Sequence, residues 1–329
     1  MIDLSIIIVN WNVRDLLADC LASIAAAPAI RIAPDGTETG SHGPRCEVIV
    51  VDSASEDGSA QMVRGRFPWV RLLAETDNIG FVRGNNHALE LAEGRHLLLL
   101  NPDTVIHGDA LGQMVRFLDK HPDVGIVGPH VLNADGSTQS TRRRLPTRLT
   151  AFFESTWLQP HAPRRVLDHY YVTDQPDDGT FEVDWVQGCA LLARREVYEN
   201  IGALDTRYVM FAEELDWCHR ARLAGWRVFY LGDAFITHLG GQSTSQVPAQ
   251  KHIYFQQSKV RYFARFHGRA FGLALWVFLL LSYTSQVGIE AGKALLGSQP
   301  ALRKTRIATY LRVIRALAIH PPLERESCA

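Results

Sequence analysis

The run of four leucines at Leu97–Leu100 constrains the fold of this chain most, because it leads directly into Asn101-Pro102-Asp103. A short apolar run bounded by a turn signal is typical of a strand that is buried on both faces. Proline cannot donate a ladder hydrogen bond and restricts the residue before it, so the strand must end there. Asp103 is therefore predicted at the carboxyl end of a buried strand, where ligands bind in open α/β sheets.

Strand and helix patterns alternate along the first 120 residues. Strands are predicted at Leu4 to Val9, Cys46 to Val51 and Val70 to Ala74, and helices at Arg14 to Ala27, Ser59 to Phe67 and Val82 to Ala92. This alternation predicts βαβ units and an α/β, Rossmann-like fold with a mostly parallel central sheet flanked by helices. The chain has neither GxGxxG nor GxxxxGK[ST], which argues against a dinucleotide-binding domain and a P-loop ATPase.

The second half of the chain is less regular. Strands are predicted at Val124 to Val131, Phe181 to Arg194 and Val228 to His238, helices at Val197 to Ile201 and Tyr208 to Trp226, and a turn at Asn133 to Gly136. Two segments rich in turn-forming residues are predicted as loops, residues 29–45 and 147–180.

Composition narrows the classes of partner and compartment. A formal net charge of −1 over 329 residues excludes a polyanion binder that works through overall charge, so no nucleic-acid partner is expected. The five cysteines are scattered without a CxxC pair, which fits a reducing compartment better than a disulfide framework or a zinc module. The N-terminus runs directly into a strand pattern, and we therefore expect no signal peptide and a cytoplasmic protein.

Two aspartates follow buried strands. Asp103 could hold a hard divalent cation against a substrate phosphate, or could simply start a turn or cap a helix. Asp52 could accept a hydrogen bond from the imide N–H of uracil or thymine, or could form a turn in DSASEDGS. If their strands are parallel neighbours, both carboxylates lie at one edge of the sheet.

An acidic cluster, Glu213-Glu214-Leu215-Asp216, opens a predicted helix. At about 100° per residue, Asp216 points roughly 200° away from Glu214, and it lies one i,i+4 step before Arg220. Glu214 is therefore the freer carboxylate for proton abstraction, although acids at a helix N-terminus also simply complement its dipole. His238 ends an apolar strand, where it is either a second metal ligand beside Asp103 or a hydrogen-bonded core residue.

Taken together, these segments resemble the inverting family 2 glycosyltransferases of the GT-A fold, especially the rhamnosyltransferase-like branch. The resemblance covers roughly residues 3 to 241. It is carried by LSIIIVNWN, VIVVDSASEDGS, DNIGFVRGNN, LLLLNPDT, VQGCALLARREVYENIGALD, and FAEELDWCHRARLAGW followed by His238.

The resemblance implies roles for individual residues. Asp103 and His238 would hold Mg²⁺ or Mn²⁺, Asp52 would bind the pyrimidine of the donor, and Glu214 would be the general base. Asp216 and Glu213 remain competitors for the base, because Glu214 stands where many relatives have Asp. The nucleotide-sugar site would further include Asn10, Asn12, Asn78, Gly80, Arg83, Asn86, Asn101 and Gly188. Asn101 replaces the first Asp of the DxD-type motif and would be a weaker, neutral ligand.

The implied activity is transfer of a sugar, with rhamnose from dTDP-rhamnose preferred, onto a glycan or polyprenyl-linked acceptor in cell-surface polysaccharide synthesis. A UDP-sugar donor is the alternative within the same fold. Alternatives from other classes are a sugar nucleotidyltransferase and a non-catalytic nucleotide-sugar-binding module. The nucleotidyltransferase would want a Gly-rich phosphate loop, which Asn10-Trp11-Asn12 does not supply.

The chain is predicted to divide into a catalytic domain, residues 1–245, and a helical C-terminal region, residues 246–329. The apolar stretch Leu273 to Tyr283 is short for a bilayer span, which favours a core helix or an interfacial helix. Basic residues interleaved with aromatic ones, beginning with Lys259, predict contact of residues 259–320 with an anionic membrane surface, at the cytoplasmic face of the inner membrane. A helical cap packed on the catalytic domain is the alternative, and a homo-oligomer is left open.

Overall fold

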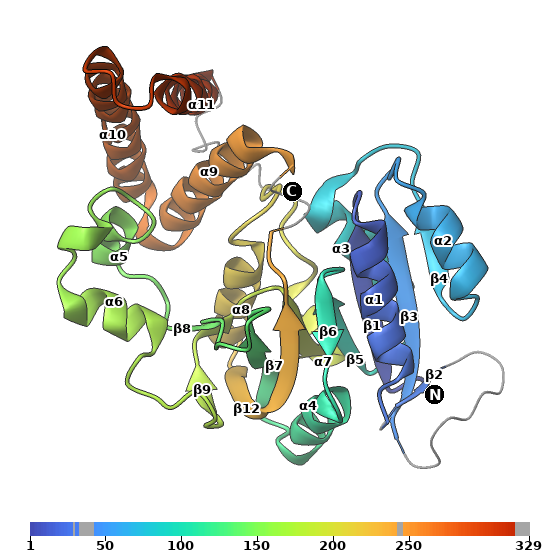
Figure 1. The fold of residues 1–329 in the computed structure, drawn as a ribbon. Coiled ribbons are helices and arrows are strands. Elements are labelled where there is room, and N and C mark those ends of the chain that lie inside the picture. The colour runs from blue at the N-terminus through green and yellow to red at the C-terminus, as the bar shows by residue number, and fades with distance from the viewer. Residues whose placement is uncertain (29, 33–42, 242–245, 320–329) are drawn as a thin grey trace. The chain divides into compact units, whose positions relative to one another are not determined.

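A computed structural model describes residues 1–28, 30–32, 43–241 and 246–319 (Figure 1). The chain divides into two compact units. The sheet unit comprises residues 1–145, 168–207 and 213–243, and the helical unit comprises residues 146–167, 208–212 and 244–329. Two short internal segments therefore group with the C-terminal helices, whereas the predicted boundary separated the chain once, after residue 245. Every candidate site residue lies in the sheet unit.

The sheet unit is built on a mixed sheet whose described strands run in the order β2-β3-β1-β5-β11-β7-β12-β6, with β4 beside β3 and β9 beside β12. The strands are β1 (Leu4–Asn10), β2 (Arg31–Ile32), β3 (Arg45–Asp52), β4 (Arg71–Ala74), β5 (His96–Leu100), β6 (Thr104–Ile106), β7 (Val124–Leu132), β9 (Phe181–Val183), β11 (Ala190–Arg194) and β12 (Arg227–His238). Strands β1 to β5 are parallel, as predicted. Strand β11 runs antiparallel between β5 and β7, and β6 and β9 run antiparallel to β12.

Helices cover both faces of this sheet. They are α1 (Arg14–Ala25), α2 (Ser59–Arg66), α3 (Gly80–Leu91), α4 (Ala110–Lys120), α7 (Arg195–Ile201) and α8 (Glu213–Leu223). Side chains from α1 and α4 pack with alternate residues of β1, β3 and β5 on one face. On the opposite face, Gly84 of α3 lies against Val9 and Val51, whose side chains point away from those of Ile8 and Val50.

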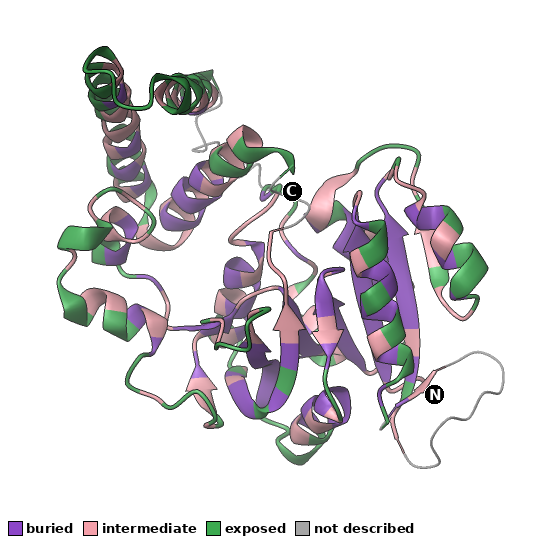
Figure 2. Ribbon diagram, viewed as in Figure 1, coloured by how far each residue is buried: buried purple, intermediate pink, exposed green. Residues whose placement is uncertain are grey.

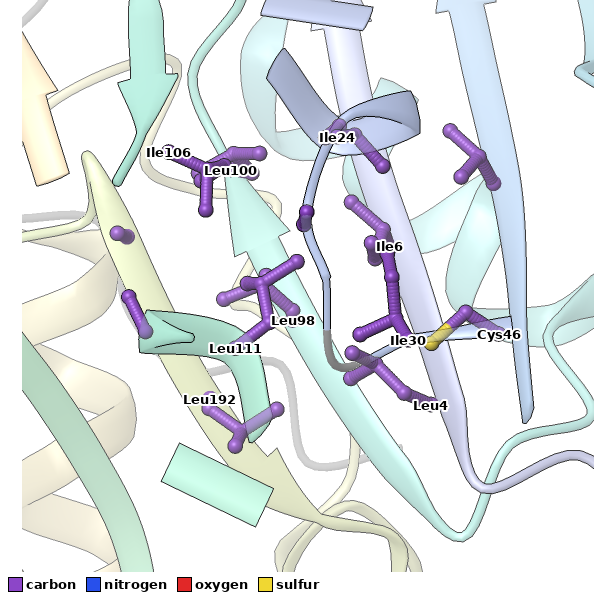
Figure 3. Close-up of a cluster of buried hydrophobic side chains, with 14 of the residues drawn as sticks. Leu4, Ile6, Ile24, Ile30, Cys46, Leu98, Leu100, Ile106, Leu111 and Leu192 are labelled. Atoms are coloured by element: carbon purple, nitrogen blue, oxygen red, sulfur yellow. The ribbon is translucent and has the colours of Figure 1, made fainter. Parts of the chain in front are cut away.

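The core confirms the prediction for the leucine run, because Leu97 to Leu100 are each no more than 2% exposed. Leu98 and Leu100 pack with Ile6 and Ile24 in the cluster drawn in Figure 3. Figure 2 shows that the central strands are buried along their length. Burial of each such side chain stabilises the fold by about 1.5–3 kcal/mol, which fixes the strand ends that carry the site.

The helix predicted from Tyr208 begins five residues later, at Glu213, and ends at Leu223. Phe211 and Ala212 have φ angles of 70° and 63°, which a right-handed helix cannot contain. The acidic cluster opens α8, as predicted, and only the bounds of the helix differ from the expectation.

Three other predicted segments differ from the structure. Residues 147–180 are not dominated by loops, since they include α5 (Arg148–Phe153), a 3₁₀ turn (Gln159–His161) and α6 (Arg164–Tyr171). The strand predicted from Phe181 to Arg194 is divided into β9, β10 (Trp185–Val186) and β11, because β10 leaves the main sheet and pairs with β8 (Arg142–Arg143). Within the loop predicted at residues 29–45, Arg31–Ile32 form β2, and residues 29 and 33–42 lie outside the described residues.

The helical unit contains α9 (Pro248–His267), α10 (Arg269–Leu295) and α11 (Pro300–Ile319). Helix α10 continues well past the apolar stretch, so it is much longer than predicted. By length and composition it could cross a membrane, with a mean hydropathy of 1.6 over an 18-residue window of which 17% is buried. This low burial argues against a core helix, and the length of 27 residues removes the expectation that the segment is too short to cross a bilayer.

Candidate functional site

The candidate residues lie at the carboxyl ends of the parallel strands. Asn10 and Asp52 end β1 and β3 and stand opposite each other in the strand register. Strand β5 pairs with the other side of β1, where Ile8 faces Leu100. Asp52 and Asp103 therefore lie at the same edge of the sheet, although their strands are not direct neighbours, because β1 lies between them.

Asp52 is 3% exposed and is held by its neighbours. Asn10 Nδ2 donates to Asp52 Oδ1 over 2.8 Å, and the backbone N–H of Ser55 donates to Asp52 Oδ2 over 3.1 Å. Ser55 Oγ also accepts from the backbone N–H of Asn12 over 2.9 Å, and Asn12 Oδ1 accepts from the backbone N–H of Glu56 over 2.8 Å. Asp52 thus organises the turn, and each carboxylate oxygen keeps a lone pair for a pyrimidine imide.

Asn78 and Gly80 shape the adjoining turn. Asn78 Oδ1 accepts from Ser53 Oγ over 3.1 Å and from the backbone N–H of Gly80 over 3.0 Å. Ser53 Oγ in turn accepts from the backbone N–H of Ile79 over 3.0 Å, which ties this turn to the one after Asp52. Gly80 has a φ of 78°, a conformation that favours glycine.

Arg83 and Asn86 stand on α3 in different surroundings. Arg83 is exposed, and within the described part of the chain it forms no ion pair, which suits a residue that meets an anionic ligand. Asn86 instead clamps the backbone of Leu204, donating to its carbonyl over 2.8 Å and accepting from its N–H over 3.1 Å. Both ends of the Asn86 amide thus contact the backbone of Leu204, while its place in the nucleotide-sugar site stays a prediction.

Asp103 and His238 converge although 135 positions separate them. Strand β6 begins directly after the turn at Asp103 and pairs antiparallel with the end of β12, so that His238 faces Thr104. His238 Nε2 lies 3.3 Å from Asp103 Oδ1 and 3.2 Å from Asn101 Nδ2. Asp103 is 6% exposed, and its carbonyl accepts from the backbone N–H of Leu239 over 3.0 Å.

This pair fits a divalent cation that has two protein ligands. Adjacent ligands of an octahedral ion with bonds of about 2.1 Å stand roughly 3 Å apart, close to the separation of Asp103 Oδ1 and His238 Nε2. No group of three His, Cys, Asp or Glu side chains gathers anywhere in the described ranges. The remaining positions would therefore belong to water and the phosphates of a ligand, as is usual for Mg²⁺.

The three acidic residues of α8 have different surroundings. Asp216 is fully buried and its Oδ2 lies 2.7 Å from Arg220 Nε, the predicted i,i+4 pair. Arg220 also donates to the carbonyls of Ile201 and Ala203, so Asp216 belongs to a structural network. Glu213 is 5% exposed, and burial raises its carboxyl pKa well above the usual range, with the nearby charge of Glu214 raising it further.

Glu214 is half-buried and lies against Gly188. A Cβ at Gly188 would lie 3.4 Å from Glu214 Cβ and 3.7 Å from its Cδ, which is ordinary van der Waals contact, so Gly188 borders the Glu214 side chain. Burial raises the pKa of Glu214, while hydrogen bonds from backbone N–H groups, including that of Gly188, and the charge of Arg143 oppose this rise. Glu214 Oε2 has no hydrogen-bond partner among the described residues. A carboxylate of raised basicity with one uncommitted oxygen is suited to proton abstraction.

Two tryptophans of the sheet unit have structural roles. Trp185 and Trp217 are buried, and their indole N–H groups donate to the carbonyls of Arg144 and Gly202. Two residues beside the site were missed by the sequence reasoning, Gln139 next to His238 and Arg143 near Glu214. Neither was assigned a role from the sequence, and only the folded chain brings them to the site.

Known proteins resemble this chain in sequence and in fold. It is 28% identical over 213 residues to the N-acetylglucosaminyl-diphospho-decaprenol L-rhamnosyltransferase of Mycobacterium tuberculosis, covering 61% of this chain and 69% of that protein. It is 23% identical over 206 residues to rhamnosyltransferase WbbL of Escherichia coli, covering 56% and 70%.

The mannosyltransferase PcManGT from Pyrobaculum calidifontis, solved with GDP-Man and Mn²⁺, matches the structure with a TM-score of 0.55 at 20% identity, covering 96% of this chain and 86% of that one. This likeness supports the predicted GT-A fold. The sequence model of glycosyl transferase family 2 matches residues 5–202, more than half of the chain. The chain therefore belongs to glycosyl transferase family 2.

Proposed function

We propose that this glycosyltransferase moves rhamnose from dTDP-rhamnose to a polyprenyl-diphosphate-linked sugar, with inversion at the anomeric carbon. The observation that carries the proposal of a metal-dependent donor site is the convergence of Asp103 and His238 at the carboxyl edge of the sheet. The rhamnosyl group is supported by the two rhamnosyltransferase relatives. The lipid-linked acceptor is supported by the first of them, an N-acetylglucosaminyl-diphospho-decaprenol L-rhamnosyltransferase.

In the proposed reaction, Glu214 removes the proton of the acceptor hydroxyl as its oxygen attacks the anomeric carbon. The bond from that carbon to the diphosphate oxygen breaks on the opposite side, which inverts the centre, and the proton remains on Glu214. Asp103 and His238 would hold Mg²⁺ or Mn²⁺, which neutralises negative charge on the departing nucleoside diphosphate. Asp52 would accept from the imide N–H of the base.

A UDP-sugar is the second candidate donor, because uracil and thymine offer the same imide N–H to Asp52. A thermal-shift panel of dTDP-rhamnose and UDP-sugars, each with and without Mn²⁺, separates the two. A ligand at 100 times its dissociation constant stabilises the folded state by about 2.7 kcal/mol. We expect dTDP-rhamnose with Mn²⁺ to give the largest shift, and stabilisation by no nucleoside diphosphate sugar would refute the proposal.

We also propose that the helical unit attaches to an anionic membrane surface, where a lipid-linked acceptor resides. Leu273, Val277 and Leu281 are exposed by 48%, 41% and 66%, and their spacing of four residues forms one apolar stripe on α10. The acid-free helix α11 packs beside α10 and exposes several cations, Lys304, Arg306, Arg312 and Arg315. An apolar stripe next to exposed cations is suited to an anionic bilayer surface.

Lys259, in contrast, does not belong to this surface. It is 6% exposed, and its Nζ donates to the carbonyl of Glu154 and lies 3.7 Å from Glu154 Oε2. The expectation that residues from 259 onward all face the membrane is therefore wrong at this position. Burial lowers the Lys259 pKa, and Glu154 opposes this change.

Two matched variants test the membrane proposal. Leu281→Glu places a charge in the stripe, whereas Leu223→Glu changes a leucine of similar exposure, 72%, in the sheet unit. We expect Leu281→Glu to reduce co-flotation with anionic liposomes and Leu223→Glu to leave it unchanged. Equal flotation of both variants and the unmodified protein would contradict the assignment of the stripe.

A further inference from the structure

We propose that Gln139 is a positioning residue that fixes the orientation and the tautomer of His238, and thereby presents His238 Nε2 to a divalent cation. This inference rests on the proposed metal-dependent donor site. Gln139 lies 99 positions before His238, and its Oε1 is 2.7 Å from His238 Nδ1, the ring nitrogen that faces away from Asp103. Such outer partners of a metal-binding histidine set which nitrogen carries the hydrogen.

The contacts of the Gln139 amide define which of its atoms faces the ring. Gln139 Nε2 donates to Asn133 Oδ1 over 2.9 Å and to the backbone carbonyl of His238 over 3.3 Å. If the amide were reversed, its oxygen would face that carbonyl, which can only accept. The amide oxygen therefore faces the imidazole, and because it only accepts, Nδ1 must carry the hydrogen.

The contacts of His238 Nε2 are consistent with the Nδ1–H tautomer. With the hydrogen on Nδ1, the neutral ring has a lone pair on Nε2, which accepts from Asn101 Nδ2 over 3.2 Å. In this neutral form Nε2 carries no hydrogen, and it lies 3.3 Å from Asp103 Oδ1. Two acceptors in this arrangement repel each other, and a divalent cation between them would bind both.

The backbone around Gln139 holds it in place. Residues 133–137 form a turn in which the N–H of Asn133 donates to the carbonyl of Ser137 over 2.8 Å, and the N–H of Gln139 then donates to the carbonyl of Val131 over 2.8 Å. Strand β7, which leads into this turn, runs parallel to β12 with Leu132 opposite Thr237. The turn is thus attached beside the end of β12, and Gln139 reaches His238 from a fixed position.

The test compares Gln139→Leu, which removes the acceptor at similar size, with Gln139→Glu, which keeps an acceptor for Nδ1–H. Gln61→Leu is the matched control, since Gln61 is exposed on α2 and makes no side-chain hydrogen bond within the described chain. Mn²⁺ affinity is measured by electron paramagnetic resonance in the presence of dTDP. We expect about a 10–100-fold weaker Mn²⁺ affinity for Gln139→Leu, and near-normal affinity for Gln139→Glu and Gln61→Leu.

A second readout needs no metal. Proton–nitrogen correlation spectra of the metal-free protein report the tautomer of each histidine, and the His238 signals are those that vanish in His238→Asn. We expect the hydrogen on Nδ1 in the unmodified protein and a loss of this preference in Gln139→Leu. Unchanged Mn²⁺ affinity and tautomer in Gln139→Leu would overturn the role of Gln139 alone. Failure of the unmodified protein to bind Mn²⁺ with dTDP would overturn the metal site itself, and this inference with it.

Discussion

Replacing Glu214 with Gln tests the proposed base most directly, because glutamine keeps the size of the side chain and loses only the ability to take the proton. Proton transfer by a positioned side chain contributes about 10²–10⁴-fold to a rate, which corresponds to about 2.7–5.4 kcal/mol at 1.36 kcal/mol per decade. Burial raises the pKa of Glu214, so the carboxylate is a stronger base than an exposed one. We therefore expect a loss in the upper part of this range.

The assay is the pH dependence of kcat/KM, measured by release of the nucleoside diphosphate at saturating Mn²⁺. A carboxyl group of raised pKa still holds its proton at a pH where an ordinary glutamate has lost it. Activity of the unmodified enzyme should therefore rise with pH through a value above 4.5, the ordinary pKa of a glutamate side chain. This rising limb should disappear in Glu214→Gln, since the variant has no carboxyl group to ionise.

Binding of the donor is the control in the same experiment. Gly188 N–H can donate to a glutamine oxygen as it does to the carboxylate, so the site should keep its shape. Thermal stabilisation by dTDP-rhamnose and Mn²⁺ should be unchanged in Glu214→Gln. Full turnover by this variant, or a loss explained only by weaker donor binding, would refute Glu214 as the base.

Three further variants test the metal ligand Asp103, the buried carboxyl of Glu213 and the buried ion pair of Asp216 with Arg220. Asp103→Ala should remove the Mn²⁺-dependent part of the thermal shift by donor, and a shift that still depends on Mn²⁺ would contradict the ligand assignment. Glu213→Gln should raise Tm relative to the unmodified protein, and the difference should grow as pH rises above 4.5. The reason is that the buried Glu213 carboxyl keeps its proton in the folded state at a pH where the unfolded state has lost it. A Tm difference that does not depend on pH would count against this. Asp216→Asn should lower the free energy of unfolding in urea by about 3–5 kcal/mol, because Arg220 then loses its buried partner, and a stability equal to that of the unmodified protein would contradict the structural role.

Local patterns were sufficient to predict the parallel strands β1, β3, β4 and β5, but not the short strands β2 and β6. The leucine run and the apolar strands before it gave correct strands, since a strand buried on both faces requires a continuous apolar sequence. The start of α8 could not be read in this way. Phe211 and Ala212 adopt left-handed conformations that neither residue type favours, so local propensity predicted a helix through them.

In the site, too, contacts within one helix were predicted, whereas contacts between distant parts of the chain were not. The pairing of Asp216 with Arg220 depends only on helical spacing, and it was predicted correctly. The contacts of Asn86 with Leu204 and of Gln139 with His238 join residues 118 and 99 positions apart, and they depend on how the elements pack. Sequence spacing contains no information about such contacts, so neither the contact of Asn86 with Leu204 nor that of Gln139 with His238 was predicted.

Asn101 shows how the fold changes the meaning of a substitution within a motif. From the sequence, it is a weaker metal ligand that replaces an aspartate. In the structure, its amide nitrogen faces His238 Nε2 at 3.2 Å, so its amide oxygen points elsewhere in this conformation. A carboxylate at this position could not donate to Nε2, and it would add a second negative charge beside Asp103. Asn101 instead donates to the lone pair of Nε2 while Gln139 accepts from Nδ1–H, and both contacts favour the tautomer in which His238 can bind a cation.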